Sequence, residues 1–207
     1  DVSAPPVDQS GPFVAAVWLD GDRDADLDLL LVGRNSPSYF FRNTAGHFMS
    51  VPSTILEDLG AVTSVVAADL DEDGDQDLCI TAVPGPSRLL RNEGDCLLTE
   101  VLCPVLAVVD SGIASACADY DLDGDHDLYL GSLTGENRLL RNDGSWSFTD
   151  ATFDVTRVGA STTGVMWWDY DRDGDDALFV TTEQFGLGQG LESQRLVAHF
   201  WPLQPGE

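Results

Sequence analysis

A nine-residue aspartate-rich segment occurs four times in the sequence at nearly constant spacing. The copies begin at Asp20, Asp69, Asp119 and Asp169, so the repeat period is 49 or 50 residues. Aspartate occupies positions 1, 3, 5, 7 and 9 of the first three copies, whereas the fourth has Ala177 at position 9. A period of this length is typical of stacked supersecondary units such as propeller blades.

Each repeat reads as four short strands. A run of small, β-prone residues precedes each aspartate segment, as in 62–68, and an apolar run follows it. A second shared element ends in Arg-Asn at 42–43, 91–92 and 141–142, before a glycine-containing turn and a last short strand. We expect each Asn to shape that turn and each Arg to pair with an acid of its own or a neighbouring repeat. The pattern predicts an all-β fold, a β-propeller of four-stranded blades with about four blades in this chain.

The whole chain, 1–207, is predicted to be a single β-propeller domain. Its repeats span approximately 11–53, 60–103, 110–153 and 160–201. The fourth repeat lacks a clear final strand, which residues 1–4 could supply as a clasp that closes the ring and removes exposed sheet edges. Four blades are the lower limit for propellers, so half of a larger ring and a ring completed by two chains remain alternatives.

The aspartate segments are predicted to bind metal ions. Four or five carboxylates within nine residues repel one another at neutral pH, and a bound cation offsets that repulsion. Side chains at positions 1, 3 and 5 converge if the loop curls, and glycine at position 6 permits the positive φ that lets the carbonyl of position 7 join them. Ala25 occupies position 6 in the first segment, so we expect a strained turn there. An all-oxygen ligand set favours Ca²⁺ over Mg²⁺.

The repeats resemble the FG-GAP or VCBS repeats of the integrin α-subunit propeller, and the run 127–150 is similar to the secreted repeat proteins grouped with ASPIC and UnbV. In that family the loop joins the first two strands of a blade and binds Ca²⁺ through side chains at positions 1, 3, 5 and 9 and a carbonyl at position 7. The resemblance implies three well-formed calcium sites and a weaker fourth, which lacks the aspartate at position 9. The implied ligands are Asp20, Asp22, Asp24, Asp26, Asp28, Asp69, Asp71, Asp73, Asp75, Asp77, Asp119, Asp121, Asp123, Asp125, Asp127, Asp169, Asp171, Asp173 and Asp175.

The charge balance narrows the range of partners. Ten Lys and Arg stand against 36 Asp and Glu, for a formal charge of −26, which disfavours nucleic acid and anionic membranes because both are bound through basic side chains. The chain also has no run of 18 apolar residues, so no membrane insertion is expected. Extracellular calcium modules bind at roughly 10⁻⁴ to 10⁻³ M, which favours a secreted or cell-surface location.

The predicted function is binding or adhesion, with an extracellular protein or glycan as ligand. The sequence contains no Gly-x-Ser-x-Gly, His-Glu-x-x-His or phosphate-loop motif, so no catalytic residues are assigned and no enzyme is expected. The alternatives are a lectin with aromatic sugar sites and a non-catalytic part of a larger extracellular enzyme or scaffold. Trp146 in a turn and Phe185 in a glycine-rich stretch are the candidate aromatic ligand contacts.

Four cysteines leave the redox state open. Cys96 with Cys103 could link one hairpin and Cys79 with Cys117 two inner strands, while buried free thiols are an equal alternative.

Overall fold

The computed structural model describes residues 9–108, 111–153, 156–157, 161–174, 176–183 and 197–202. The first sheet comprises β1 (Phe13–Leu19), β2 (Asp28–Gly33), β3 (Tyr39–Thr44) and β4 (His47–Val51). The second comprises β5 (Val62–Ala68), β6 (Asp77–Ala82), β7 (Arg88–Asn92) and β8 (Leu98–Val101). The third comprises β9 (Gly112–Ala118), β10 (Asp127–Ser132), β11 (Arg138–Asn142) and β12 (Phe148–Asp150). The fourth has three described strands, β13 (Ser161–Trp168), β14 (Ala177–Glu183) and β15 (Val197–Pro202).

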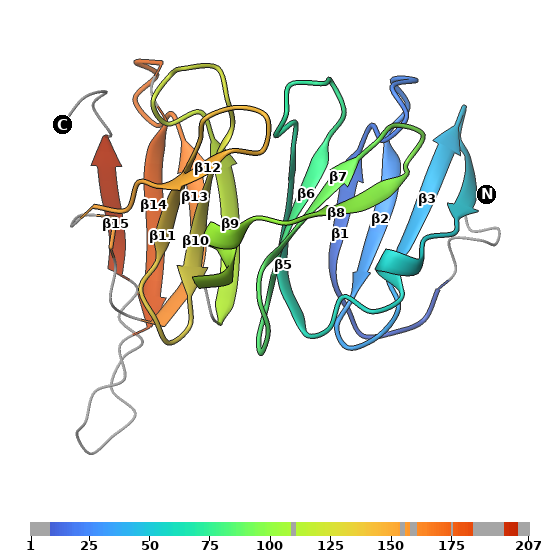
Figure 1. Ribbon diagram of the computed structural model, residues 1–207, viewed down its shortest axis with the longest axis horizontal. Coiled ribbons are helices and arrows are strands. Elements are labelled where there is room, and N and C mark those ends of the chain that lie inside the picture. The colour runs from blue at the N-terminus through green and yellow to red at the C-terminus, as the bar shows by residue number, and fades with distance from the viewer. Residues whose placement is uncertain are drawn as a thin grey trace.

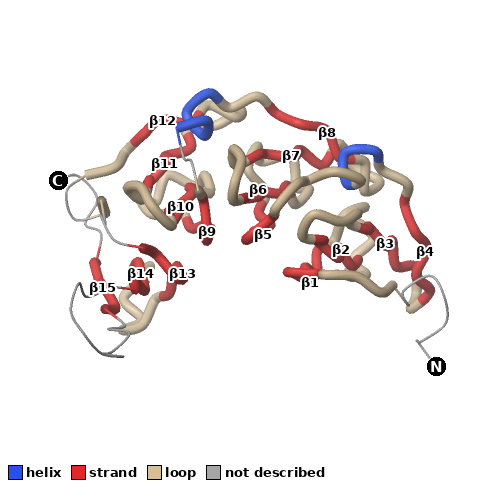
Figure 2. The backbone as a smooth tube through the Cα atoms, turned by 90° about the horizontal axis from the view of Figure 1, so that it is seen from below, coloured by secondary structure: helices blue, strands red, loops and turns tan. Residues whose placement is uncertain are grey.

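Within each sheet the strands pair antiparallel in chain order, which is the arrangement of a propeller blade. Figure 1 shows the four sheets side by side. Figure 2 shows them along an open arc, with β1, β5, β9 and β13 on the concave side and β4, β8 and β12 on the convex side. The prediction of an all-β propeller with four blades in this chain is confirmed. The clasp predicted for residues 1–4 lies outside the described residues.

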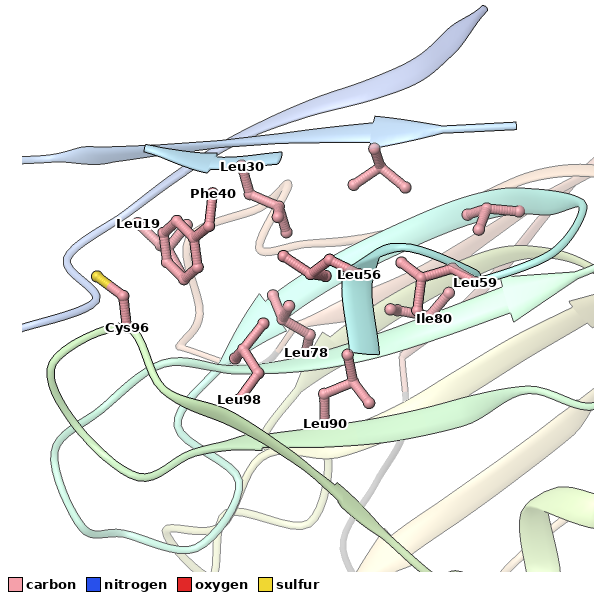
Figure 3. Packing of buried hydrophobic residues seen from close by; sticks show 12 residues of the cluster. Leu19, Leu30, Phe40, Leu56, Leu59, Leu78, Ile80, Leu90, Cys96 and Leu98 are labelled. Carbon is pink, nitrogen blue, oxygen red and sulfur yellow. The ribbon is translucent and has the colours of Figure 1, made fainter. Parts of the chain in front are cut away.

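The described part of the chain has three hydrophobic core clusters, one between each pair of consecutive sheets. Figure 3 shows the first of these, in which Leu30 and Phe40 of the first sheet face Leu78 and Leu90 of the second. Every residue of β6 and β10 is buried, because both faces of each strand pack against a neighbouring sheet. Full burial of one such leucine contributes about 1.5–3 kcal/mol, so these clusters hold the sheets together.

Short connections lead from one sheet to the next. The 3₁₀ helix η1 (Thr54–Leu56) follows β4, and η2 (Pro104–Val108) follows β8. Each contributes one buried leucine, Leu56 or Leu106, to the cluster between the sheets that it connects. None of the described helices is long and apolar enough to cross a membrane.

The four cysteines are free thiols, so neither possible disulfide pairing is formed in the structure. Cys79, Cys103 and Cys117 pack in the cluster between the second and third sheets. Cys96 lies in the cluster between the first and second sheets, where its Sγ is 3.4 Å from Oδ2 of Asp28.

Candidate metal centres

The four aspartate segments form the loops between the first and second strands of the four sheets. Because these strands have equivalent places in every sheet, the loops lie at one end of the propeller. The backbone curls as expected at position 6, where φ is +91°, +106° and +99° at Gly74, Gly124 and Gly174. Ala25 holds the same position in the first loop with φ of +68°, a left-handed conformation that costs a residue with a Cβ. The expectation of a strained turn is confirmed.

A second left-handed residue stands at position 4 of every loop, with φ between 60° and 64°, at Arg23, Glu72, Leu122 and Arg172. None of these is glycine, so the residue types at position 4 do not indicate this conformation. The two left-handed residues turn the chain twice within nine residues.

The aspartates at positions 1 and 5 accept hydrogen bonds from backbone N–H groups of their own loops. The carboxylate at position 1 accepts the N–H of position 6 in all four, at 3.0–3.2 Å. The carboxylate at position 5 accepts the N–H of position 7 in the first three, at 2.8–3.0 Å. The aspartates therefore cap their own backbone, as short polar side chains do in turns.

The aspartate at position 9 is buried in the first three loops, as Asp28, Asp77 and Asp127. In each, Oδ2 accepts the N–H of position 2 at 2.8–3.0 Å. Oδ1 accepts the N–H of the Asn in the last two residues of the third strand, at 2.7–2.8 Å. This residue therefore ties the start of the loop to the third strand as well as facing the other carboxylates.

The structure brings positions 1, 3 and 9 of the first three loops together. Each residue offers an oxygen within 4.8 Å of the others, in the clusters Asp20, Asp22, Asp28; Asp69, Asp71, Asp77; and Asp119, Asp121, Asp127. The position 5 residues Asp24, Asp73 and Asp123 are not members of these clusters. The fourth loop groups Asp169, Asp171 and Asp173, which are more exposed, and Asp175 lies outside the described residues.

Unpartnered oxygens recur at two loop positions. The buried Oδ1 atom has no hydrogen-bond donor among the described residues at position 1 in Asp20, Asp69 and Asp169, and at position 3 in Asp22, Asp71 and Asp121. A buried carboxylate oxygen without a hydrogen-bond donor lowers the stability of the folded state, and such oxygens coordinate hard cations. The aspartate clusters of these loops therefore fit a bound hard metal cation.

Several of the loop carboxylates have raised pKa values. Burial raises the pKa of Asp77 and Asp127 to about 7, although their backbone hydrogen bonds act in the opposite direction. Burial also raises the pKa of Asp22 and Asp121, and the charges of aspartates in the same loop raise it further. A divalent cation would favour the ionised form of all four.

The Arg-Asn pairs have the roles expected from the sequence. Each Asn side-chain oxygen accepts a glycine N–H of the following turn, at 2.9–3.2 Å. The Nδ2 groups of Asn92 and Asn142 also donate to the position 2 carbonyl of the preceding repeat's loop, at 3.0 and 2.9 Å. The arginines pair with acids: Arg42 with Asp22, Arg91 with Asp71 at 2.9 Å, and Arg141 with Asp143 at 2.7 Å.

The structure describes one of the two candidate aromatic ligand contacts. Trp146 is half-buried between the second and third sheets, and its Nε1 donates to Oδ2 of Asp71 at 2.9 Å. It thus supports the second loop from the neighbouring repeat. Phe185 lies outside the described residues.

A cavity of about 540 Å³ lies among the second, third and fourth loops. Positions 1 and 8 of these loops line it with polar groups, together with the apolar Leu122 and small residues of β5 and β9. The polar lining residues are Asp69, Gln76, Asp119, His126, Asp169 and Asp176. Sequence reasoning missed this cavity because position 8 varies from repeat to repeat and its side chains meet only across sheets.

Two solved structures are similar to this chain in fold. A lectin of Agrocybe aegerita that recognises non-reducing terminal N-acetylglucosamine is 16% identical, with a TM-score of 0.55 over 81% of this chain and 46% of the lectin. BBS1N, solved in complex with ARL6DN, is 11% identical, with a TM-score of 0.54 over 88% of this chain and 54% of its own. The chain thus spans about half the length of both. At these identities the likeness shows the fold alone.

No curated protein matches the chain. The model of the FG-GAP-like repeat matches residues 20–80 and 119–180, which together make up more than half of the sequence. Each matched segment begins at the first aspartate of a loop, and each ends in the second strand of the following sheet. The chain belongs to the FG-GAP-like repeat family.

Proposed function

We propose that this chain is a secreted or cell-surface binding module, a β-propeller stabilised by Ca²⁺ that presents one face to a glycan or protein ligand. The observation that carries the proposal is the repetition, in three loops, of a cluster of three aspartates with unpartnered buried oxygens. The proposed role is binding and adhesion, not catalysis.

Calcium would be held in the first three loops by positions 1, 3 and 9, with the position 7 carbonyl as a further donor. It would supply positive charge to carboxylates whose burial disfavours ionisation. The fourth loop has Ala177 in place of the buried acid, so its affinity is lower. Extracellular modules of this kind bind Ca²⁺ at roughly 10⁻⁴ to 10⁻³ M, which supports a location outside the cell.

The ligand site that the geometry supports best is the polar cavity among the second, third and fourth loops. Gln76 and His126 contribute hydrogen-bonding groups, and the carboxylates of Asp119 and Asp176 accept hydrogen bonds from hydroxyl groups. Leu122 adds an apolar contact. Many hydroxyl donors and some apolar surface characterise carbohydrates, so a glycan is the first class of ligand to test, and the fold of the Agrocybe aegerita lectin supports this choice.

Thermal unfolding in calcium and in chelator tests the role of the metal. An ion that binds only the folded state stabilises it by about 2.7 kcal/mol per site at one hundred times its dissociation constant. We expect a clear rise in Tm with Ca²⁺ and a smaller one with Mg²⁺. A Tm that is identical in calcium and chelator would refute the proposed metal sites.

Binding to a glycan array, followed by calorimetry with each positive sugar and with N-acetylglucosamine, tests the ligand. We expect binding that Gln76→Ala and His126→Ala weaken, while Met49→Ala, an exposed residue of β4 outside the cavity, leaves it unchanged. No sugar bound across a broad array would favour a protein ligand. Binding that both cavity variants retain would place the ligand elsewhere.

A further inference from the structure

The two residues before each aspartate loop pack on opposite faces of their sheet, and this alternation determines which side chains lie at the two ends of the arc. The residue two places before each loop faces the preceding sheet, and the residue directly before the loop faces the following one. Ala67, Cys117 and Trp167 accordingly pack in the clusters toward the preceding sheets. Leu19 and Ala68 are buried toward the following sheets.

Two positions have no sheet to face among the described residues. Trp18, two places before the first loop, is 54% exposed, and Trp168, directly before the fourth loop, is 59% exposed. The fourth sheet adds Met166 and Tyr170, which are also exposed. The position of Tyr170 is held in the two preceding repeats by Leu70 and Tyr120, which pack against the following sheet. Each end of the arc therefore presents the apolar half of a sheet-to-sheet contact.

The charges at the two ends complement each other in the same way. Arg23, at position 4 of the first loop, donates two hydrogen bonds to Asp75, at position 7 of the second, at 2.5 and 2.8 Å. Arg172 holds position 4 of the fourth loop and has no ion pair with a described residue. Asp26 holds position 7 of the first loop at the other end, where it is partly exposed. A contact between the fourth and first sheets in this register would place Arg172 beside Asp26.

We propose that a second copy of this chain covers these ends and completes the ring. The fourth sheet of each copy packs on the first sheet of the other, so two equivalent head-to-tail contacts close an eight-sheet propeller. Within one copy these sheets lie at opposite ends of the arc (Figure 2). Eight blades are within the range of known propellers, and head-to-tail contacts close when the rotation permits. This chain covers about half of each matched solved chain, so two copies of it would supply about the full length of one. This inference goes beyond the proposed function and does not depend on it.

Light scattering coupled to size exclusion, in calcium, tests the proposal on the chain itself. We expect twice the mass of one chain. Trp168→Asp and Trp18→Asp should each raise the dissociation constant of the dimer roughly 30-fold per contact, or roughly 1,000-fold over its two contacts. Leu102→Asp, which changes an exposed leucine beyond the end of β8, is the matched control and should leave the dimer unchanged. Thermal unfolding of each variant verifies that it folds.

Mixing the two variants distinguishes a ring from other dimers. A Trp168→Asp copy keeps an intact first sheet and a Trp18→Asp copy keeps an intact fourth sheet, so the mixture regains one of the two contacts and should dimerise more tightly than either variant alone. The mass of a single chain at every attainable concentration would overturn the proposal. A dimer that Trp168→Asp disrupts and Trp18→Asp leaves intact would also overturn the proposal, because it would indicate a contact between two fourth sheets.

Discussion

Ala25 provides a direct test of how backbone conformation limits the first loop. It is the one position 6 residue with a Cβ, and its φ of +68° lies where the other loops have glycine. An L-residue in the left-handed region costs roughly 1–2 kcal/mol, and glycine loses about 0.5–1 kcal/mol more conformational entropy on folding than alanine. Ala25→Gly should therefore raise the free energy of unfolding by about 0.5–1 kcal/mol. In a domain of this size that corresponds to a rise in Tm of roughly 1–4 °C.

The reverse change in the third loop serves as the counterpart. A Cβ added at Gly124 meets no atom within 4 Å, so Gly124→Ala changes only the backbone preference at a φ of +106°. It should lower the free energy of unfolding by about 1 kcal/mol or more. Both effects should be measured by urea unfolding in chelator, where no ion contributes.

A matched control separates turn strain from metal binding. Ala45 is also left-handed, with φ of +53°, but lies in the turn between β3 and β4. Ala45→Gly should stabilise the protein by a similar amount without changing calcium affinity, whereas Ala25→Gly should also tighten calcium binding in the first loop. A neutral or destabilising Ala25→Gly, together with a Gly124→Ala that has no effect, would show that the left-handed backbone at position 6 does not limit stability.

Three further predictions concern the carboxylates and their partners. Because the folded-state pKa values of Asp77 and Asp127 are raised to about 7, the metal-free protein binds more protons than the unfolded chain between about pH 4 and pH 7. In urea unfolding with chelator, these two groups should therefore lower the free energy of unfolding as pH rises through that window. The gain in that free energy on adding calcium should grow over the same window. A gain that is constant with pH would contradict this. Asp127→Ala should abolish one calcium site in calorimetry, while Asp123→Ala, outside the three-residue cluster, should weaken calcium binding at that site less. Equal losses of affinity in the two variants would show that Asp123 is as important a ligand as Asp127. Trp146→Phe keeps an aromatic side chain but loses the indole N–H that donates to Asp71, so it should lower the free energy of unfolding by at least about 0.5–1.5 kcal/mol in the same assay. An unchanged value would show that the contact contributes nothing.

The parts of the structure that the sequence predicted are those set by local chemistry. The repeat period, the strands that flank each loop and the positive φ at position 6 follow from residue type and spacing alone. The Asn and Arg roles followed as well, because turn-forming and ion-pairing tendencies belong to the side chains.

The parts that were missed depend on contacts between repeats or on backbone hydrogen bonds. The dual role of Asp127, which accepts N–H groups from Tyr120 and Asn142, depends on the register of three strands. The left-handed conformation of Leu122 is imposed by the loop rather than by its own preference. The exposure of Trp18 depends on which sheets have neighbours, which residue type does not reveal.

The proposal that the aspartate loops bind calcium is tested by calorimetric titration of the metal-free protein with Ca²⁺, repeated with Mg²⁺ and with the Asp127→Ala variant. We expect three calcium sites of comparable affinity and a weaker fourth. We also expect proton release on binding near pH 6, as the carboxyl groups with raised pKa values ionise, and the loss of one site in the variant. The absence of a calcium heat at millimolar concentrations, or a stoichiometry that Asp127→Ala leaves unchanged, would contradict it.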